Sequence, residues 1–362
     1  MPPHVPPGRP PKAGSSQAAP LHPTAPDGAS PTAPGSRRAA PLLPSVPDHE
    51  SLSAAQVRSL RPSRPFPDAW TPLGVAEEEE RQLDGSRARA ATLFLAGAEC
   101  PWACVFCDLW RYTIEGPTPR GALPAQIRHG LAALRQPPSV VKLYNASNFF
   151  DPRAVPPEDD ATIAELVRSF GRVVVENHPR LTGERALEFA RRLDGMLEVA
   201  LGLETVDARA QPRLGKGAAL DDFERAAALL RGPGIDVRAF LLVGAPYVPQ
   251  AERLASIVAS ARFARDRLDA CHVSLIPVRG GNGAIERLAA EGEFLAPDLA
   301  LLEDALDHCI EAAPGAVVSA DLWDLERLAG CATCFAARRA RLERINLSGV
   351  GEPRVQCPAC GP

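Results

Sequence analysis

The sequence predicts an α/β fold, a partial (β/α)6 barrel similar to a TIM barrel, followed by a small C-terminal metal-binding module with four cysteines. From residue 91 onward, apolar runs rich in β-branched residues alternate with amphipathic stretches. The apolar runs are nearly continuous, as expected for parallel strands that helices cover on both faces. Six such repeats favour an incomplete barrel over an open doubly wound sheet. In both folds the chemistry lies at the carboxyl ends of the strands.

The expected elements follow one another with short connections. Strands are expected at residues 91–97, 140–145, 172–177, 197–205, 237–244 and 271–278. Helices are expected at 122–135, 160–170, 183–193, 220–231 and 252–268, and a later one at 298–313. Residues 76–85, AEEEERQLDG, carry the charge of a solvated helix that leads into the barrel.

Composition sets the domain boundaries. Residues 1–67 are crowded with Pro, Ala, Ser and Gly and cannot bury enough apolar surface to offset their chain entropy, so a disordered tail is expected there. The lead-in is expected at 68–90, the core barrel at 91–325 and the cysteine module at 326–362. The cysteine module is expected to resemble a zinc ribbon or to hold an auxiliary iron–sulfur cluster.

Charge and hydropathy narrow the class of protein. Residues 1–65 hold seven Lys and Arg against three Asp and Glu, a charge of +4, which leaves −8 for the rest of the chain. An acidic body argues against broad, non-specific nucleic-acid binding. The sequence shows neither a secretory signal nor a run of about 18 apolar residues, so no membrane contact and a cytoplasmic location are expected.

Three cysteines stand directly after the first expected strand. Cys100, Cys104 and Cys107, in ECPWACVFC, are therefore expected on the first loop at the mouth of the barrel. A [4Fe–4S] cube normally takes four thiolates, and a local set of three leaves one iron open to an external ligand. A structural zinc knuckle is the alternative, but it needs a fourth ligand and does not explain the position after a strand.

The C-x3-C-x2-C spacing, with an aromatic residue before the last cysteine, resembles the signature of the radical S-adenosylmethionine (SAM) superfamily. With its GLET, K-G and FLLVGAP segments, the chain is similar to the group that contains the elongator catalytic subunit, the tRNA methylthiotransferases and uncharacterised relatives of the archaeosine-forming radical enzymes. The resemblance covers about half of the chain, from Thr92 to Pro277.

The resemblance implies a [4Fe–4S] cluster whose open iron chelates SAM, and reductive cleavage of SAM to a 5′-deoxyadenosyl radical. It also implies an electron donor such as flavodoxin or ferredoxin. The substrate is unidentified, and tRNA is one candidate because those relatives act largely on tRNA. A radical enzyme of small-molecule biosynthesis and a non-catalytic, metal-stabilised binding module are the alternatives.

The resemblance further implies cofactor-binding residues at the strand ends. Phe106 is expected near the adenine, and Asn145 and Ser147 stand where relatives have a Gly-Gly-Glu motif for the SAM amino group. The other expected contacts are Glu204 with the ribose or amino group, Arg213 and Lys216 with the carboxylate, and Gly244 and Ile276 with adenine through their backbone. Glu176 and His178 are candidates to face the substrate.

A second metal site is expected at the C-terminus. Cys331 and Cys334, then Cys357 and Cys360, form two C-x2-C pairs separated by 22 residues. This spacing suits zinc between two knuckle turns, and an auxiliary iron–sulfur cluster is the alternative. The helix expected between the pairs carries four arginines: Arg338, Arg339, Arg341 and Arg344. They are expected to form either a solvated face or a contact with RNA phosphates. Cys271 and Cys309 are expected to be buried, inert thiols.

Overall fold

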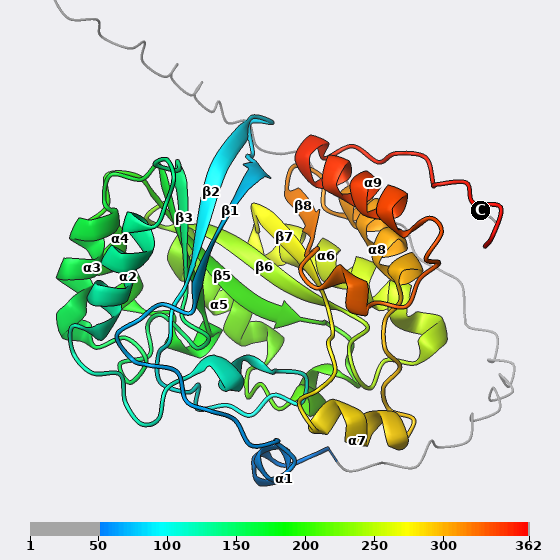
Figure 1. Ribbon diagram of the computed structural model, residues 1–362, viewed down its shortest axis with the longest axis horizontal. Helices are drawn as coiled ribbons and strands as arrows, with labels where there is room; N and C mark the ends of the chain where they lie inside the picture. The colour runs from blue at the N-terminus through cyan, green and yellow to red at the C-terminus, as the bar shows by residue number, and fades with distance from the viewer. Residues whose placement is uncertain (1–50, 361–362) are drawn as a thin grey trace, which may run out of the picture. The chain divides into compact units, whose positions relative to one another are not determined.

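The computed structural model describes residues 51–360, and its centre is one eight-stranded sheet in chain order (Figure 1). Strand β1 pairs antiparallel with β2, and every later neighbour pair is parallel. The strands are β1 (Gly74–Arg81), β2 (Arg87–Phe94), β3 (Val140–Tyr144), β4 (Arg172–Asn177), β5 (Met196–Glu204), β6 (Asp236–Val243), β7 (His272–Pro277) and β8 (Val317–Ala320).

Helices connect the parallel strands and cover the outer face of the sheet (Figure 1). The α-helices are α1 (Ala54–Ser59), α2 (Ala122–Ala132), α3 (Asp160–Val167), α4 (Glu184–Ala190), α5 (Leu220–Arg231), α6 (Arg253–Leu268), α7 (Ala284–Ala290), α8 (Leu299–Ala312) and α9 (Phe335–Ser348). Short 3-10 turns lie at Leu109–Tyr112, Pro157–Asp159, Pro179–Leu181, Gln211–Leu214, Gln250–Glu252 and Leu325–Arg327.

The predicted α/β fold class is confirmed. The six expected strands correspond to β2 to β7, and the six expected helices to α2 to α6 and α8, with ends that differ by at most four residues. The sheet curls into a nearly closed barrel of eight strands, since β1 and β8 extend it beyond the six predicted repeats. Helix α9 packs against both β1 and β8.

The predicted helix at residues 76–85 is wrong, because these residues form most of β1 and the turn after it. The acidic side chains alternate between two sides of the strand, as the strand period of two requires. Glu77 pairs with Arg89 and Arg135 on one side. Glu78 and Glu80 pair with Lys142 on the other. Cross-strand cations therefore stabilise a strand in a sequence whose composition suits a helix.

The predicted tail of residues 1–67 falls outside the described residues as far as residue 50. From Ser51 onward the expectation of disorder is wrong. Ser53 caps α1 in a capping box with Gln56, and Val57 is buried. Val57 shares a small core with Val105, Leu214 and Leu288, so α1 packs against the cysteine loop and α7. Figure 1 shows α1 and α7 side by side at the carboxyl end of the strands.

The main core lies between the outer face of the sheet and the helices. It is built from the alternate apolar residues of each strand and the inner faces of α2 to α6 and α8. The inner face of the sheet is partly polar and includes Lys142, Glu198 and Arg238, each less than 10% exposed. Within the part of the chain that the structure describes, no helix has the length and apolar character needed to cross a membrane.

Candidate active site

The cysteine loop follows β2 at the carboxyl end of the barrel, and backbone groups fix its shape. Val105 N donates to Leu214 O at 3.0 Å, and Asn282 Nδ2 donates to Val105 O at 2.9 Å and to Cys107 O at 3.2 Å. Each contact joins the loop to a segment that follows a later strand. The three thiols are therefore held by the tertiary structure, and their position does not depend on the loop sequence alone.

Two glycines of the LGKG segment allow this close packing. Gly215 has a φ of +74°, and a Cβ there would lie 2.9 Å from Ala103 O. Gly217 has a φ of +70°, and a Cβ there would lie 2.6 Å from the indole nitrogen of Trp102. Only glycine combines a positive φ with the absence of a side chain. The segment after β5 therefore presses directly on the backbone and Trp102 of the cysteine loop.

The three cysteines lie near one another in a desolvated place. Burial raises the pKa of all three thiols, that of Cys104 to about 12. The neighbouring thiols of Cys104 and Cys100 raise the pKa of Cys107 further. Asn148 Nδ2 donates to Cys100 Sγ at 3.2 Å. Thiolates are stable in such a place only when positive charge compensates them, as metal ions do. The set thus fits the three protein ligands of an iron–sulfur cluster.

Lys216 supplies positive charge next to this loop. Burial opposes its charge, yet Glu204 and the two thiols Cys104 and Cys100 raise the pKa of Lys216 above its ordinary value. Its Nζ donates to Glu204 Oε1 at 2.9 Å, and the two side chains are 13% and 7% exposed. Glu204 ends β5 with a φ of +66°, a conformation uncommon for a residue other than glycine. The pair links the end of β5 to the cysteines.

The end of β3 forms a turn of backbone amides around Glu176. Ala146 has a φ of +56°, and the backbone amides of Asn145, Ala146 and Ser147 lie close enough to the Glu176 carboxylate to lower its pKa. Burial raises the pKa of Glu176 to about 7, although these amides and the charge of Lys216 lower it. Asn145 Oδ1, Ser147 Oγ and Glu176 Oε1 are buried and have no hydrogen-bond partner within residues 51–360. A polar ligand would satisfy all three atoms.

A cavity of about 680 Å³ joins these residues to the interior of the barrel. Of the residues predicted to bind SAM, it is lined by Phe106, Glu204 and Ile276, and the turn residue Ala146 lies between Asn145 and Ser147. Glu176 also lines it, as does Cys107. The structure therefore brings the cysteine loop, the ends of β3 to β5 and the end of β7 to one cavity.

Of the predicted SAM contacts, five are not on the wall of this cavity: Asn145, Ser147, Arg213, Lys216 and Gly244. Two of these, Arg213 and Gly244, have other roles. The Arg213 guanidinium lies over the Tyr247 ring at 3.8 Å and pairs with Glu293, and it does not line the cavity. Gly244 does not line it either. Its φ is +80°, and a Cβ there would lie 2.7 Å from Arg253 Nη2, so its role is a tight turn after β6.

The His178 ring supports the cysteine loop and does not face the cavity. It stacks on Trp102 with a centroid distance of 3.5 Å and an interplanar angle of 11°. Its Nε2 donates to Lys216 O at 3.0 Å, and its Nδ1 accepts from the Arg180 amide at 3.2 Å. Burial and the charge of Lys216 lower the pKa of His178 to about 3. The ring is neutral and both nitrogens are used.

A charged cluster inside the barrel was not predicted from the sequence. Arg238 on β6 pairs with Glu80 of β1 at 2.7 Å and with Glu198 of β5, and Lys142 of β3 pairs with Glu80 at 3.3 Å. Burial raises the pKa of Glu80, but the charges of Arg238 and Lys142 lower it to about 2. Single charged residues inside apolar strands were the only signal for this cluster.

Aromatic rings share the wall of the cavity with the charged cluster. Tyr144 and Phe240 meet edge to face at 6.2 Å, and Phe94 and Trp323 do so at 5.1 Å. All four residues line the cavity, together with Lys142 and Arg238. The cavity can therefore accept a molecule that is flat on one part and polar on another.

The four C-terminal cysteines come together as predicted. Cys331 Sγ lies 3.9 Å from Cys357 Sγ, and Cys334 Sγ lies 3.7 Å from Cys360 Sγ. All four sulfur atoms lie within 4.8 Å of one another, a group that could hold a metal ion. The backbone amides of Cys334 and Thr333 lower the pKa of Cys331 to about 6, so this thiol readily becomes a ligand.

The two remaining cysteines lie apart from both groups. Cys309 is fully buried in the main core. Cys271 is half-buried, and its Sγ contacts Val237 O at 3.3 Å. Burial raises the pKa of both thiols, which makes them poor nucleophiles.

Acidic residues neutralise the arginines of α9. Arg341 is 1% exposed and pairs with Glu303 and Asp307. The other three also have acidic partners: Arg338 with Glu303, Arg339 with Glu326 and Glu343, and Arg344 with Glu352. Helix α9 therefore offers little net positive charge to RNA phosphates, and its arginines fasten the cysteine module to α8.

Comparisons with known proteins agree with this site. A match to the Radical SAM superfamily covers residues 96–257, from the start of the cysteine loop into α6. The archaeosine synthase subunit beta of Methanosarcina acetivorans is 24% identical over 226 residues, which are 59% of this chain and 65% of that protein. The alignment thus spans just under two thirds of that relative. An uncharacterised protein of Methanocaldococcus jannaschii is 21% identical over 81% of this chain and 86% of its own length.

Solved structures with similar chains include the queuine lyase from Clostridium spiroforme bound to SAM and queuine. Its TM-score is 0.42 and its sequence identity is 16%, over 55% of this chain and 78% of that chain. A spore photoproduct lyase mutant with dinucleoside spore photoproduct has a TM-score of 0.43, 16% identity, and coverage of 62% and 74%. The match, the cysteine motif inside it and the place of that motif after the first parallel strand identify residues 96–257 as a radical SAM domain.

Proposed function

We propose that this enzyme holds a [4Fe–4S] cluster on Cys100, Cys104 and Cys107, binds SAM beside it, and modifies a polar substrate enclosed in the barrel. The observation that carries this proposal is the 680 Å³ cavity, which runs from Cys107 past Glu176 to Lys142 and Arg238. When bound, the cluster and SAM would supply the reductive chemistry and hydrogen abstraction that family membership implies.

The residues around the cysteine loop fit the polar end of SAM. Glu176 Oε1 and Asn145 Oδ1 are acceptors without a partner in the described part of the chain, and a protonated amino group would satisfy them. Lys216 would attract the SAM carboxylate, a role predicted for the segment after β5. Glu204 would accept from the ribose hydroxyls or the amino group. Phe106 and Ile276 would cover the adenine, as their place on the cavity wall allows.

The rest of the cavity favours a substrate about the size of a nucleobase. Aromatic rings can stack on a flat ring system, while Glu80 Oε2 and Arg238 Nη2 are buried without a partner among residues 51–360. A ring with both donors and acceptors at its edge would satisfy them. The name of the relative archaeosine synthase subunit beta supports a modified nucleoside.

Such a base could arrive within tRNA or as a small molecule. The relatives that the sequence resembles favour tRNA as the carrier. The neutralised arginines of α9 favour a free molecule, because a phosphate backbone is normally bound by clustered cations. Comparing tRNA nucleosides from a deletion strain with those of the wild type separates the two. An unchanged nucleoside profile would count against tRNA.

At the C-terminal cysteines we propose a single zinc ion. A zinc–sulfur bond of about 2.3 Å in a tetrahedron places two sulfurs about 3.8 Å apart. The two separations between sulfurs, 3.9 and 3.7 Å, are close to this value. Because a [4Fe–4S] cube places iron atoms between its thiolates, it would hold the sulfurs farther apart.

Anaerobic reconstitution tests the main proposal. Protein reconstituted with iron and sulfide should be brown, give the electron paramagnetic resonance signal of a reduced [4Fe–4S] cluster, and cleave SAM when dithionite is added. Cys104→Ala should abolish the cleavage. Cys271→Ala is the matched control, because this half-buried thiol lies outside both cysteine groups. Full cleavage by Cys104→Ala would contradict the proposal, as would colourless protein with only zinc bound.

A further inference from the structure

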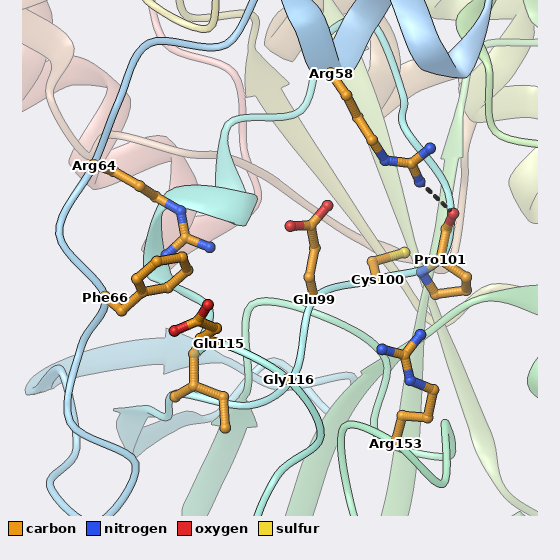
Figure 2. A pocket seen from close by; sticks show the side chains of 10 residues that line it. Arg58, Arg64, Phe66, Glu99, Cys100, Pro101, Glu115, Gly116 and Arg153 are labelled. Atoms are coloured by element: carbon orange, nitrogen blue, oxygen red, sulfur yellow. Dashed lines mark hydrogen bonds between the residues drawn. The ribbon is translucent and has the colours of Figure 1, made fainter.

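A second cavity, of about 460 Å³, lies on the outer side of the cysteine loop (Figure 2). Its walls include Arg58, Arg64, Phe66, Cys100, Pro101 and Arg153, and we call it the arginine pocket. Of the described residues, none lines both this pocket and the barrel cavity. The cysteine loop thus separates the two, with Cys107 on the wall of the barrel cavity and Cys100 on the wall of the arginine pocket.

Two exposed arginines flank the point where Cys100 reaches the surface. Figure 2 shows Arg58 and Arg153 on opposite sides of Cys100 and Pro101. Arg58 Nη2 donates to the neutral acceptor Pro101 O at 2.9 Å, and no carboxylate within residues 51–360 pairs with it. The Arg153 guanidinium makes no hydrogen bond or ion pair with any residue that the structure describes. Both charges remain available to a partner.

A third arginine, Arg64, is fixed in place by hydrogen bonds to neutral acceptors of the described chain. Arg64 donates to Thr113 Oγ1 at 2.9 Å and to Thr113 O, and its guanidinium lies 4.4 Å from the centre of the Phe66 ring. Two carboxylates also line the pocket. Glu99 is paired with Arg61 at 2.7 Å, while Glu115 is exposed. Positive charge therefore exceeds negative charge on the wall of the arginine pocket. Residues 66–362 as a whole carry a net charge of −8, so this local charge is the opposite of the overall one.

We propose that the arginine pocket is the docking surface for an acidic one-electron carrier protein, which reduces the cluster through the Cys100 side. This inference rests on the proposed function, because it needs a cluster on the three cysteines. In the step, the carrier's flavin or iron–sulfur centre loses one electron and the cluster gains it, and no bond is made or broken. Complementary charge would bring the acidic rim of the carrier onto Arg58 and Arg153.

The position of Cys100 favours a carrier protein over RNA as the occupant. An electron donor benefits from the shortest path to the cluster, and the pocket gives that path while leaving the barrel cavity free for substrate. Exposed Phe66 and Pro101 add an apolar contact beside the charges, as protein interfaces have. Residues 51–67 build one wall of this pocket, which gives that ordered segment a function.

Charge reversal with two reductants tests the proposal. The variants are Arg58→Glu, Arg153→Glu and the double variant, and the control is Arg262→Glu, an exposed arginine on α6 remote from the cysteine loop. SAM cleavage is measured with reduced bacterial flavodoxin and, separately, with dithionite. For the double variant the KM for flavodoxin should rise on the order of tenfold at low salt. Its dithionite-driven rate should match that of the wild type.

Salt dependence gives a second readout. The wild type should lose flavodoxin-driven rate as ionic strength rises, and the double variant should lose much less, because screening acts on the charges that it lacks. Arg153→Glu alone keeps the test valid if Arg58→Glu disturbs the loop, since the Arg153 side chain has no partner to lose in the part of the chain that the structure describes.

The possible outcomes are distinct. An unchanged KM for flavodoxin would overturn the docking proposal alone, and so would an equal loss with both reductants. Loss of tRNA binding by the double variant, with its flavodoxin-driven rate intact, would assign the surface to RNA and overturn the proposal as well. Wild-type protein that cleaves no SAM with dithionite would overturn the proposed function and this inference with it.

Discussion

Removing one charge of the buried Lys216–Glu204 pair should destabilise the protein more than removing both. The two atoms are 2.9 Å apart, and the side chains are 13% and 7% exposed. Lys216→Met leaves a desolvated carboxylate without compensation, which costs about 3–5 kcal/mol of unfolding free energy. The double variant Lys216→Met with Glu204→Gln has no uncompensated charge. Its unfolding free energy should therefore be about 2 kcal/mol higher than that of Lys216→Met alone, within the roughly 0.5–3 kcal/mol by which mutations of contacting residues depart from additivity.

Urea denaturation of the full chain measures this cycle. The wild type, both single variants and the double variant are unfolded anaerobically, without cluster, and followed by far-ultraviolet circular dichroism. The control is Arg191→Met, which breaks an exposed pair with Glu184 at 2.8 Å. Surface pairs contribute about 0–1 kcal/mol, so this variant should be nearly neutral. Strictly additive free energies in the Lys216 cycle would refute the reasoning.

Gly202 offers an independent perturbation of the same pair. A Cβ at this position would lie 2.2 Å from Glu204 Oε1 and 2.7 Å from Lys216 Nζ. Gly202→Ala should therefore push the two side chains apart without removing either charge. If the pair matters, this variant should lose both stability and affinity for SAM in equilibrium dialysis. Wild-type SAM affinity in Gly202→Ala would show that the pair lies away from the cofactor.

Three further predictions follow from the site. The folded-state pKa of Glu176 is raised from 4.5 to about 7, so the folded chain keeps a proton that the unfolded chain loses, and the unfolding free energy should fall by up to about 3 kcal/mol between these pH values. Glu176→Gln should flatten that part of the urea-denaturation pH profile, and an unaltered slope would contradict the assignment. Cys334→Ser should remove one equivalent of zinc by elemental analysis while the iron bound at the cysteine loop stays the same, and joint loss of both metals would argue against two separate sites. Gly217→Ala should lower the iron content, because its Cβ would meet Trp102, whereas Gly116→Ala, with a φ of +72° and open space around it, should not.

Much of the fold could be predicted from local patterns. Strand β4 contains a run of three buried valines and β3 begins with two, and such runs are visible in sequence because burial on both faces of a strand favours consecutive apolar residues. The cysteine groups are visible because metal ligation fixes short spacings between thiols. Their place after a strand then followed from the chain order.

Residues whose partners are distant in sequence could not be placed this way. His178 follows a strand end as a substrate-facing residue would, but the stacked Trp102 and the Lys216 carbonyl hold it in a supporting role. Arg213 lies near Lys216 in the chain, yet Tyr247 and Glu293 hold it outside the cavity. Their local sequences carry no sign of these contacts.

The sequence alone therefore determined the fold class, the three-cysteine loop and the paired C-terminal cysteines, since each depends on a local pattern. The tertiary structure decided which polar residues share a cavity. It also decided that the acidic run at Glu77 to Glu80 is a strand, because Lys142 and Arg238 come from β3 and β6 to meet it. The physical reason is that the free energy of a buried charge depends on its partners, and chain folding alone brings those partners within a few ångströms.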